Sequence, residues 1–396
     1  MWRTVSLGEV CTISSSKRIF ANEYQSVGIP FYRGKEIIEK HNGNNITTEL
    51  FISQERYEEI RKKYDVPKKG DILLTSVGTL GVPWLVDEEN FYFKDGNLTW
   101  FRCNSELLPD YLYFWFHSFE AKTQIDSRFI GSTQKALTID SLKKFRITIP
   151  PIDLQKKIIS VIRPLEQQII INRSINENLE QQCWNYFYEL FINNADSIWP
   201  KCTLSDIGSV VSGGTPSKSK LEYYTEKGIS WITPKDLSVN KSKFISHGEI
   251  DISELGFAKS NAQKLPAGTV LFSSRAPIGY IAIAQNVVTT NQGFKSIIPN
   301  KNIGTAYTYY LLKYLLPTIE AMGSGSTFKE ISGSVMKSVP TVMPDDSTLK
   351  NFTEFCEPIF RKQEILEIQN NYLTTIRNIL LPKIMSGELD ITKIRF

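Results

Sequence analysis

The sequence predicts an α+β protein that is built twice. We expect two similar domains with mixed or antiparallel twisted sheets, joined by two long antiparallel coiled-coil helices in a pseudo-two-fold arrangement. First, the chain has 396 residues, 41% of them hydrophobic, which exceeds the size at which one core usually stops growing. Second, its second half repeats the first in order. Third, each half ends in a segment whose apolar residues recur every three or four positions.

The repeat is carried by short motifs that keep their order along the chain. Residues 28–31 recur at 228–231, residues 70–76 at 268–274, and residues 131–133 at 325–327. Lys35 corresponds to Lys235, and Pro164 corresponds to Pro358. The period is far longer than that of a solenoid, so we expect two copies of one domain plan. A tandem protein whose domains share no task is the alternative.

The first part of each half contains short β-rich runs, residues 71–75 and 269–273, each entered through a glycine turn. Apolar and aromatic stretches follow at 111–116 and 307–316. A run this apolar is more typical of a core element than of a base-stacking surface, so both stretches are predicted to be buried helices.

The second part of each half carries the helical spacing. The positions that define it are Ile158, Ile162, Leu165, Ile169, Leu179 and Leu190 in one copy, and Phe352, Ile359, Leu366, Leu373 and Leu380 in the other. Because proline is tolerated best in a helix's first turn, Pro164 and Pro358 predict a short helix, a break, and then a long helix. Asn176 and Asn370 occupy matching seam positions, either as buried amides that fix the helix register or as solvated side chains.

At this point the sequence resembles the DNA-specificity (S) subunits of type I restriction-modification systems, over nearly the whole chain. The motifs that carry the resemblance are Gly213-Gly214-Thr215-Pro216-Ser217 and the segments 231–237, 265–279, 291–295 and 380–389. The first half departs from them, with Ser14-Ser15-Ser16-Lys17 in place of the glycine motif and Val77-Gly78-Thr79 in place of Arg275-Ala276-Pro277. The departure fits a family whose two domains read different sequences.

The resemblance implies a non-catalytic subunit that reads an asymmetric bipartite double-stranded DNA target, with one half-site per domain and a spacer set by the helices. It also implies partners: two methylation subunits and, in the restriction complex, endonuclease/translocase subunits. We expect no cofactor in this chain and S-adenosylmethionine on the methylation subunit. The expected segments are a first target-recognition domain at 1–151, a central helical spacer at 152–195, a second target-recognition domain at 196–344, and a C-terminal helical spacer and tail at 345–396.

Composition bears on the remaining classes of function. A net charge of +4 means that any affinity for nucleic acid must come from local patches. The five cysteines form no CxxC pair and are expected to be reduced thiols, and no signal-peptide or membrane-spanning run is found, so we expect a cytoplasmic protein without membrane contact. The three scattered histidines predict no metal site, and neither a phosphate-binding GxxxxGK[ST] loop nor an amino-methyltransferase tetrad occurs.

One pattern has the letters of a nuclease motif: Pro109-Asp110 followed by Glu120-Ala121-Lys122. In such enzymes two carboxylates hold a divalent metal and the lysine assists the attacking water. Here the residues flank an apolar helix-like run, whereas that chemistry needs adjoining strands to bring the carboxylates together. We therefore interpret the segment as a capped helix with solvated ends.

Candidate DNA-binding residues are basic and polar side chains in turn-rich stretches, which suit contacts to phosphates and base edges. They are Lys17, Arg18, Arg33, Lys35, Arg128, Thr133 and Lys135 in the first half, and Thr215, Lys218, Lys220, Lys235, Ser274, Arg275, Gln292, Thr327 and Lys329 in the second. Two alternatives remain open: a nuclease or methyltransferase, and a purely structural protein whose domains are spaced by coiled helices.

Overall fold

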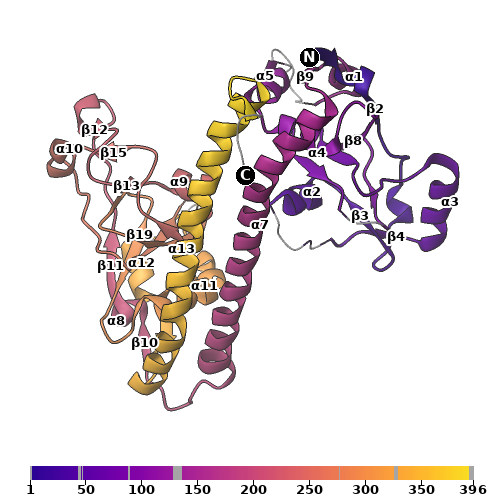
Figure 1. Cartoon of the computed structure of the whole chain (residues 1–396). Coiled ribbons are helices and arrows are strands. Elements are labelled where there is room, and N and C mark those ends of the chain that lie inside the picture. The colour runs from indigo at the N-terminus through magenta and orange to yellow at the C-terminus, as the bar shows by residue number, and fades with distance from the viewer. Residues whose placement is uncertain are drawn as a thin grey trace. The chain divides into compact units, whose positions relative to one another are not determined.

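The computed structural model describes residues 2–42, 46, 48–87, 90–127, 136–275, 277–324 and 329–391. The chain forms two compact units, unit 1 (Met1–Ile175 with Gln369–Phe396) and unit 2 (Asn176–Ile368), and Figure 1 labels many of their elements. Each unit takes in part of both long helices, α7 (Ile152–Tyr188) and α13 (Asp346–Met385). Among the described residues no helix has the length and apolar character needed to cross a membrane.

Unit 1 contains a four-stranded sheet in the order β2-β8-β5-β6, a three-stranded sheet β4-β3-β7, and the pair β1-β9. Its strands are β1 (Arg3–Ser6), β2 (Cys11–Ser14), β3 (Ile29–Tyr32), β4 (Phe51–Ile52), β5 (Ile72–Thr75), β6 (Pro83–Leu85), β7 (Tyr92–Phe93), β8 (Leu98–Cys103) and β9 (Arg146–Ile149). Its shorter helices are α1 (Leu7–Val10), α2 (Gly34–His41), α3 (Gln54–Tyr64), α4 (Pro109–Phe116), α5 (Phe119–Asp126) and α6 (Ile139–Lys143).

Unit 2 contains a five-stranded sheet, β11-β19-β16-β17-β14, and the pairs β12-β15, β13-β18 and β10-β20. Its strands are β10 (Lys201–Thr203), β11 (Gly208–Ser212), β12 (Tyr224–Thr225), β13 (Trp231–Ile232), β14 (Phe244–Ile245), β15 (Asp251–Ile252), β16 (Val270–Ser274), β17 (Ile278–Ala284), β18 (Thr289–Thr290), β19 (Lys295–Pro299) and β20 (Pro340–Val342). Its shorter helices are α8 (Leu204–Ile207), α9 (Pro234–Val239), α10 (Glu254–Ala258), α11 (Thr305–Ala321) and α12 (Gly333–Ser338).

The two units confirm the predicted fold class and repeat. Strands β2, β8, β5 and β6 of unit 1 recur in the same order as β11, β19, β16 and β17 of unit 2. Strand β3 pairs in parallel with β7, as β13 does with β18, while the pairs β1-β9 and β10-β20 are antiparallel. Gly70 and Gly268 precede β5 and β16 at φ +93° and +83°, a conformation that L side chains rarely adopt, so the glycine turns are confirmed as well.

The predicted breaks at the two prolines are wrong. Helix α7 runs through Pro164, and α13 continues over residues 346–385 and so includes position 358. A proline inside a helix removes one hydrogen bond and costs about 3 kcal/mol or more. Ile158, Ile162 and Ile169 on the same helix are buried, and each such side chain contributes about 1.5–3 kcal/mol. Burial along one face of α7 therefore offsets the local cost and keeps this helix intact.

Within each unit the segments of α7 and α13 run antiparallel, as predicted. In unit 1 the amide of Asn172, which is buried, donates to the Oδ1 of Asn370 at 2.9 Å. In unit 2 the Nε2 of Gln363 donates to the backbone oxygen of Asn176 at 3.1 Å. The matched asparagines thus face the other helix and are half-buried, and the fully buried amides beside them are Asn172 and Gln363.

Each unit has its own apolar core. The predicted aromatic helices are confirmed as α4 and α11, and the rings of Tyr111 and Tyr310 are fully buried in the cores of unit 1 and unit 2. Both cores include residues of the long helices, Ile158 and Leu381 in unit 1 and Phe187 in unit 2. The sheets and shorter helices of each unit therefore pack on the long-helix segments of that unit.

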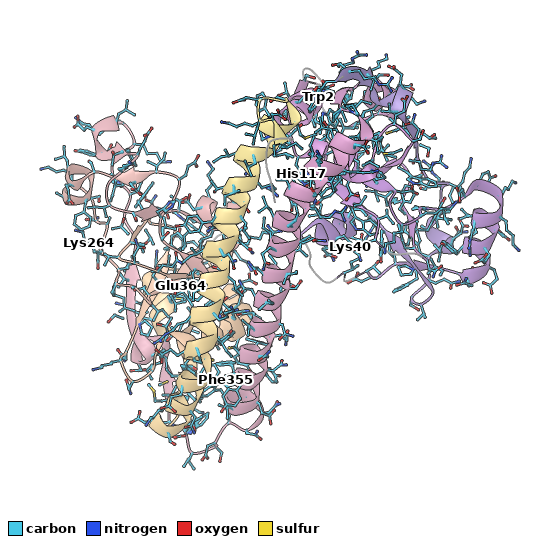
Figure 2. All side chains as sticks on the ribbon, viewed as in Figure 1. Trp2, Lys40, His117, Lys264, Phe355 and Glu364 are labelled. Atoms are coloured by element: carbon cyan, nitrogen blue, oxygen red, sulfur yellow. The ribbon has the colours of Figure 1, made fainter. Side chains whose placement is uncertain are left out.

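The cysteines are free thiols. Two of the histidines that the sequence separates lie together in unit 1, because the rings of His41 and His117 stack with centroids 5.2 Å apart. Burial lowers the pKa of His117, labelled in Figure 2, to about 3. Over the described ranges no group of three or more potential metal ligands is found.

Candidate nucleic-acid interface

Unit 2 contains a pocket of about 670 Å³ that gathers five of the predicted site residues. They come from four separate segments of the chain: Thr215, Lys218, Lys235, Arg275 and Gln292. The rest of the lining is Leu221, Tyr224, Trp231, Thr233, Pro234, Asp236, Glu249, Ile250, Asn291 and Gly293. Apolar rings, amides, cations and two carboxylates thus meet in one concave surface.

Two glycines allow the loops of this pocket to approach closely. A Cβ added to Gly213 would lie 1.9 Å from the backbone oxygen of Asn291, and one added to Gly214 would lie 2.3 Å from the backbone nitrogen of Ala262. The backbone of Gly214 also accepts a hydrogen bond from the indole nitrogen of Trp231 at 3.0 Å. The Gly-Gly motif is therefore required by close contact of backbone with backbone.

Lys235 lies in the first turn of α9, so the expectation that it lies in a loop is wrong. This helix begins after Thr233, whose backbone nitrogen and hydroxyl both donate to the carboxylate of Asp236, at 2.7 and 2.6 Å. The ammonium of Lys235 donates to Glu249 at 2.6 Å, and this bond raises the pKa of Lys235. With side-chain exposures of 70% and 63%, the Lys235–Glu249 pair is a surface ion pair that salt screens.

Arg275 and Gln292 are polar residues of the pocket lining that keep exposed side chains. Arg275 makes an ion pair with Glu330 at 3.5 Å, and both side chains remain over a third exposed. Gln292 is exposed, and its backbone nitrogen donates to the Thr215 hydroxyl at 3.5 Å. The buried Lys295 contacts the same loop, because its ammonium donates to the backbone oxygen of Gln292 at 3.3 Å.

Ser274 lies in the interior of unit 2 and does not line the pocket surface. It is fully buried, and its hydroxyl donates to the backbone oxygen of Gly293 at 3.0 Å. A direct DNA contact by Ser274 is therefore inconsistent with its burial. Lys220 is exposed beside Glu222, and Lys329 is also exposed. Arg128, Thr133, Lys135 and Thr327 lie outside the described residues.

Unit 1 presents a different basic pocket, of about 520 Å³. Of the predicted residues it contains Lys17 and Arg18, and the fold adds Arg56, Glu59, Ile60, Lys62, Lys63 and Tyr64 from α3 and its end. The ammonium of Lys17 lies 4.4 Å from the ring centroid of Tyr64, a cation–π distance. Arg18 pairs with Asp95 at 2.9 Å.

Arg33 and Lys35 do not line that pocket. Arg33 precedes α2, and its guanidinium donates to the buried carboxylate of Glu36 at 2.8 Å. Lys35 lies in the first turn of α2 and pairs with Glu39 at 3.7 Å, so its expected loop position is also wrong. The repeat thus places Lys35 and Lys235 at the second residue of equivalent helices, each following a strand that pairs in parallel.

Sequence reasoning missed the residues that complete both pockets. Trp231 and Tyr224 supply the aromatic wall in unit 2, and their rings are 5.7 Å apart. In unit 1 the missed cations are Arg56, Lys62 and Lys63 on α3. The basic run before Tyr64 was the available signal, but helical periodicity alone does not show which face of α3 meets Lys17.

The nuclease-like pattern lies on helices. Asp110 belongs to α4 and makes an ion pair with Arg163. Glu120 belongs to α5 and accepts a hydrogen bond from the indole of Trp115 at 3.1 Å. Both carboxylates lie in the first turn of a helix, as expected, and Glu120 is exposed. Asp110 is half-buried in its ion pair, so the expected solvated end is wrong at that residue.

These features define a tandem-repeat protein whose two copies of one framework carry unlike pockets, a basic one in unit 1 and one of mixed character in unit 2. The chain belongs to the type I restriction modification DNA specificity domain family, whose model matches residues 1–181 and 197–381. The matches cover both copies of the repeat.

Individual relatives agree with this assignment. The chain is 40% identical over 190 residues to the type I restriction enzyme MjaIX specificity subunit of Methanocaldococcus jannaschii, covering 46% of the chain and 44% of the relative, so the match spans less than half of that protein. It is 23% identical over 470 residues to the type I restriction enzyme HindI specificity subunit of Haemophilus influenzae, covering 98% and 99%. The fold is similar to that of the type I restriction-modification S subunit of M. genitalium, with TM-score 0.59, 17% identity, and 97% and 96% of the two chains covered.

Proposed function

We propose that the chain reads an asymmetric bipartite DNA target for a type I restriction-modification complex, one half-site per unit, and that catalysis belongs to its partner subunits. The observation that supports this proposal is the contrast between the two pockets. Unit 2 offers Trp231, Arg275 and Gln292, whereas unit 1 offers a cluster of lysines and arginines around Tyr64. Two domains that read different half-sites need different pocket residues, even when they share one fold.

The repeat suggests which residues position the DNA and which read it. Lys35 and Lys235 recur at the same place although the two pockets differ, so a contact common to both is best assigned to phosphate, which carries no sequence information. Arg275 corresponds to Val77 in the repeat, and an arginine fork matches guanine O6 and N7 in the major groove. The amide of Gln292 matches adenine N6 and N7 in the same way.

The long helices are proposed to set the spacer and to dock the partners. We assign residues 1–151 and 196–344 to the two target-recognition domains, and residues 152–195 and 345–396 to the helical spacers. Two methylation subunits carrying S-adenosylmethionine would bind this scaffold, joined by endonuclease/translocase subunits in the restriction complex.

The test is co-expression with candidate methylation subunits in a host that lacks other DNA methylation, followed by mapping of the methylated sites. We expect one bipartite, non-palindromic target. Replacement of residues 1–150 with those of another family member should change one half-site alone. A palindromic target, a change in both half-sites, or methylation without sequence preference would contradict the proposal.

A further inference from the structure

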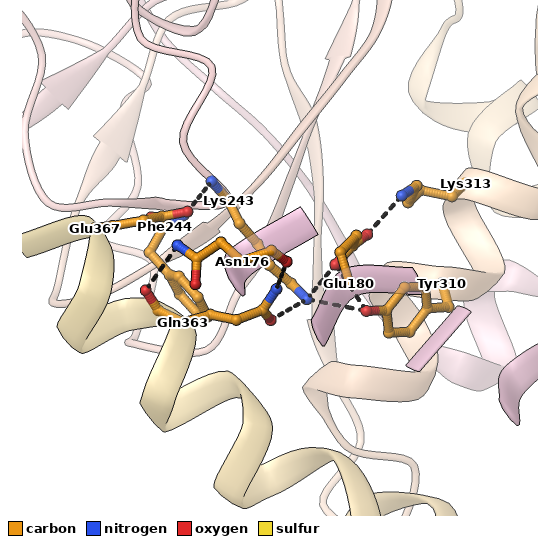
Figure 3. Close-up of polar contacts among 8 residues, drawn as sticks. All are labelled: Asn176, Glu180, Lys243, Phe244, Tyr310, Lys313, Gln363 and Glu367. Carbon is orange, nitrogen blue, oxygen red and sulfur yellow. Dashed lines mark hydrogen bonds and ion pairs between the residues drawn. The ribbon is translucent and has the colours of Figure 1, made fainter. Parts of the chain in front are cut away.

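Unit 2 buries a lysine that the DNA pocket does not use. Lys243 precedes β14, and its side chain is only 7% exposed. Its ammonium donates to Glu180 at 2.8 Å, to Gln363 at 3.0 Å and to the hydroxyl of Tyr310 at 3.1 Å (Figure 3). These partners come from α7, α13 and α11. One cation therefore joins a strand of the sheet to both long helices.

The network continues on either side of this ammonium. Glu180 accepts a second bond from Lys313 at 2.6 Å and a third from the hydroxyl of Tyr310 at 2.8 Å. The ring of Phe360, on α13, lies 3.5 Å from the Lys243 ammonium. The cation is thus held by a carboxylate, an amide, a hydroxyl and an aromatic face, all with defined directions.

The backbone of the same segment is bound to α13. Glu367 accepts hydrogen bonds from the backbone nitrogens of Lys243 at 2.9 Å and Phe244 at 3.1 Å, as Figure 3 shows. Strand β14 is at the end of the five-stranded sheet, and β17 is its only partner among the described strands. The carboxylate of Glu367 therefore satisfies donors that a further strand would otherwise take.

This anchored segment connects directly to the pocket. Lys235 precedes Lys243 along the chain and Glu249 follows it, and these two pocket residues pair with each other. Fixing Lys243 on the helix segments thus fixes the part of the chain that carries both. A buried ion pair is weak evidence for a stabilising role, because apolar residues can often replace it without loss of stability. The directional polar contacts of Lys243 are better explained as fixing the position of this segment on the helices.

The equivalent anchor in unit 1 has the opposite chemistry. The proline alignment pairs Arg173 with Glu367, and the alignment of Lys35 with Lys235 places Asn42 one residue before the position of Lys243. Arg173 donates to the backbone oxygen of Asn42 at 3.3 Å. In unit 1 the long helix donates to this segment, whereas in unit 2 it accepts from it.

We propose that Lys243, held by Glu180 and Glu367, is a positioning residue that fixes where the half-site of unit 2 lies along its helix segments. The inference rests on the proposed function. Its consequence is that the cluster controls tolerance to spacer length and does not control the bases that are read. Because the corresponding contact in unit 1 has the opposite chemistry, each unit is matched to the helix segments on which it packs.

The test uses Lys243→Met in the assembled methyltransferase, with Lys241→Met as the matched control, because Lys241 is an exposed lysine of the same loop. Methylation rates are measured on duplexes with the native spacer, with the spacer changed by one base pair, and with single base changes in the half-site. We expect discrimination between spacers to fall about fivefold or more for Lys243→Met, with base preferences unchanged. Lys241→Met should leave both unchanged.

A variant that removes both charges, Lys243→Met with Glu180→Gln, is measured alongside in case the single variant does not fold. Unchanged spacer discrimination in a folded variant, or an altered base preference, would overturn the positioning role. If the wild-type complex itself shows no bipartite preference, the proposed function fails instead, so the two failures are distinguishable.

Discussion

The two carboxylates around Lys243 should respond to pH with opposite sign, which allows the network to be tested by stability alone. The nearby ammonium groups of Lys243 and Lys313 outweigh burial and hold the pKa of Glu180 at about 2, below its ordinary value of 4.5. A carboxylate with a lowered folded-state pKa contributes stability that is present above the unfolded pKa and is lost as the pH falls through the folded pKa. The window is therefore pH 4.5 down to 2.

The magnitude follows from the shift. A difference of about 2.5 pKa units corresponds to on the order of 3 kcal/mol at pH 7. By the linkage relation about 2 kcal/mol of this is lost by pH 3. Glu180→Gln cannot ionise, so its deficit in unfolding free energy relative to wild type should shrink by that amount between pH 7 and pH 3. Urea denaturation followed by circular dichroism at pH 7, 5, 4 and 3 measures it.

Glu367 should show the opposite pH dependence of stability, and Glu354 is the control. Burial raises the pKa of Glu367 to about 7, so its contribution is fully present below pH 4.5 and is lost as the pH rises towards 7. Glu367→Gln should therefore gain stability relative to wild type over that rise. Glu354→Gln, which alters an exposed glutamate of α13, is the control for the loss of a carboxylate outside the network. A deficit of Glu180→Gln that stays constant with pH would refute the assignment of its charge partners.

Three further predictions concern DNA. Lys235→Ala should weaken DNA binding similarly on all sequences and flatten its salt dependence by about one unit of slope. Arg275→Ala should instead cost about 1–3 kcal/mol of discrimination at one base pair. Affinities of both variants for cognate and singly substituted duplexes, measured across a salt series, separate the two patterns. Four residues inserted near Asn176 lengthen a helix by about 6 Å, which is comparable to about two base pairs of DNA. Target mapping of the active variant should therefore show a longer spacer. An unchanged spacer would exclude the proposal that helix length sets the spacer. Asp110→Asn with Glu120→Gln should leave cleavage by the restriction complex intact, and loss of cleavage with normal DNA binding would support the nuclease alternative.

Patterns local in sequence predicted much of the fold. Short β-rich runs after glycine turns located β5 and β16, and apolar aromatic stretches located α4 and α11. The internal repeat predicted that both units would share one domain plan. These features depend on short-range periodicity and on glycines that adopt positive φ, and both can be read from neighbouring residues. The breaks at Pro164 and Pro358 were wrong because the cost of a proline is local, whereas the burial that offsets it involves residues distant in sequence.

The candidate site shows the same limit at single residues. By itself the sequence determined the repeat, the family resemblance and the residue types that suit DNA. Only the tertiary structure decided that Ser274 is buried under Gly293, that Arg275 faces Glu330, and that Trp231 joins Lys235 in one pocket. It alone also showed that Lys243, one lysine among many in the sequence, lies inside unit 2 between α7 and α13. The physical reason is that burial and ion pairing depend on which segments meet in space, and residues far apart along the chain become partners only after the sheets and helices have assembled.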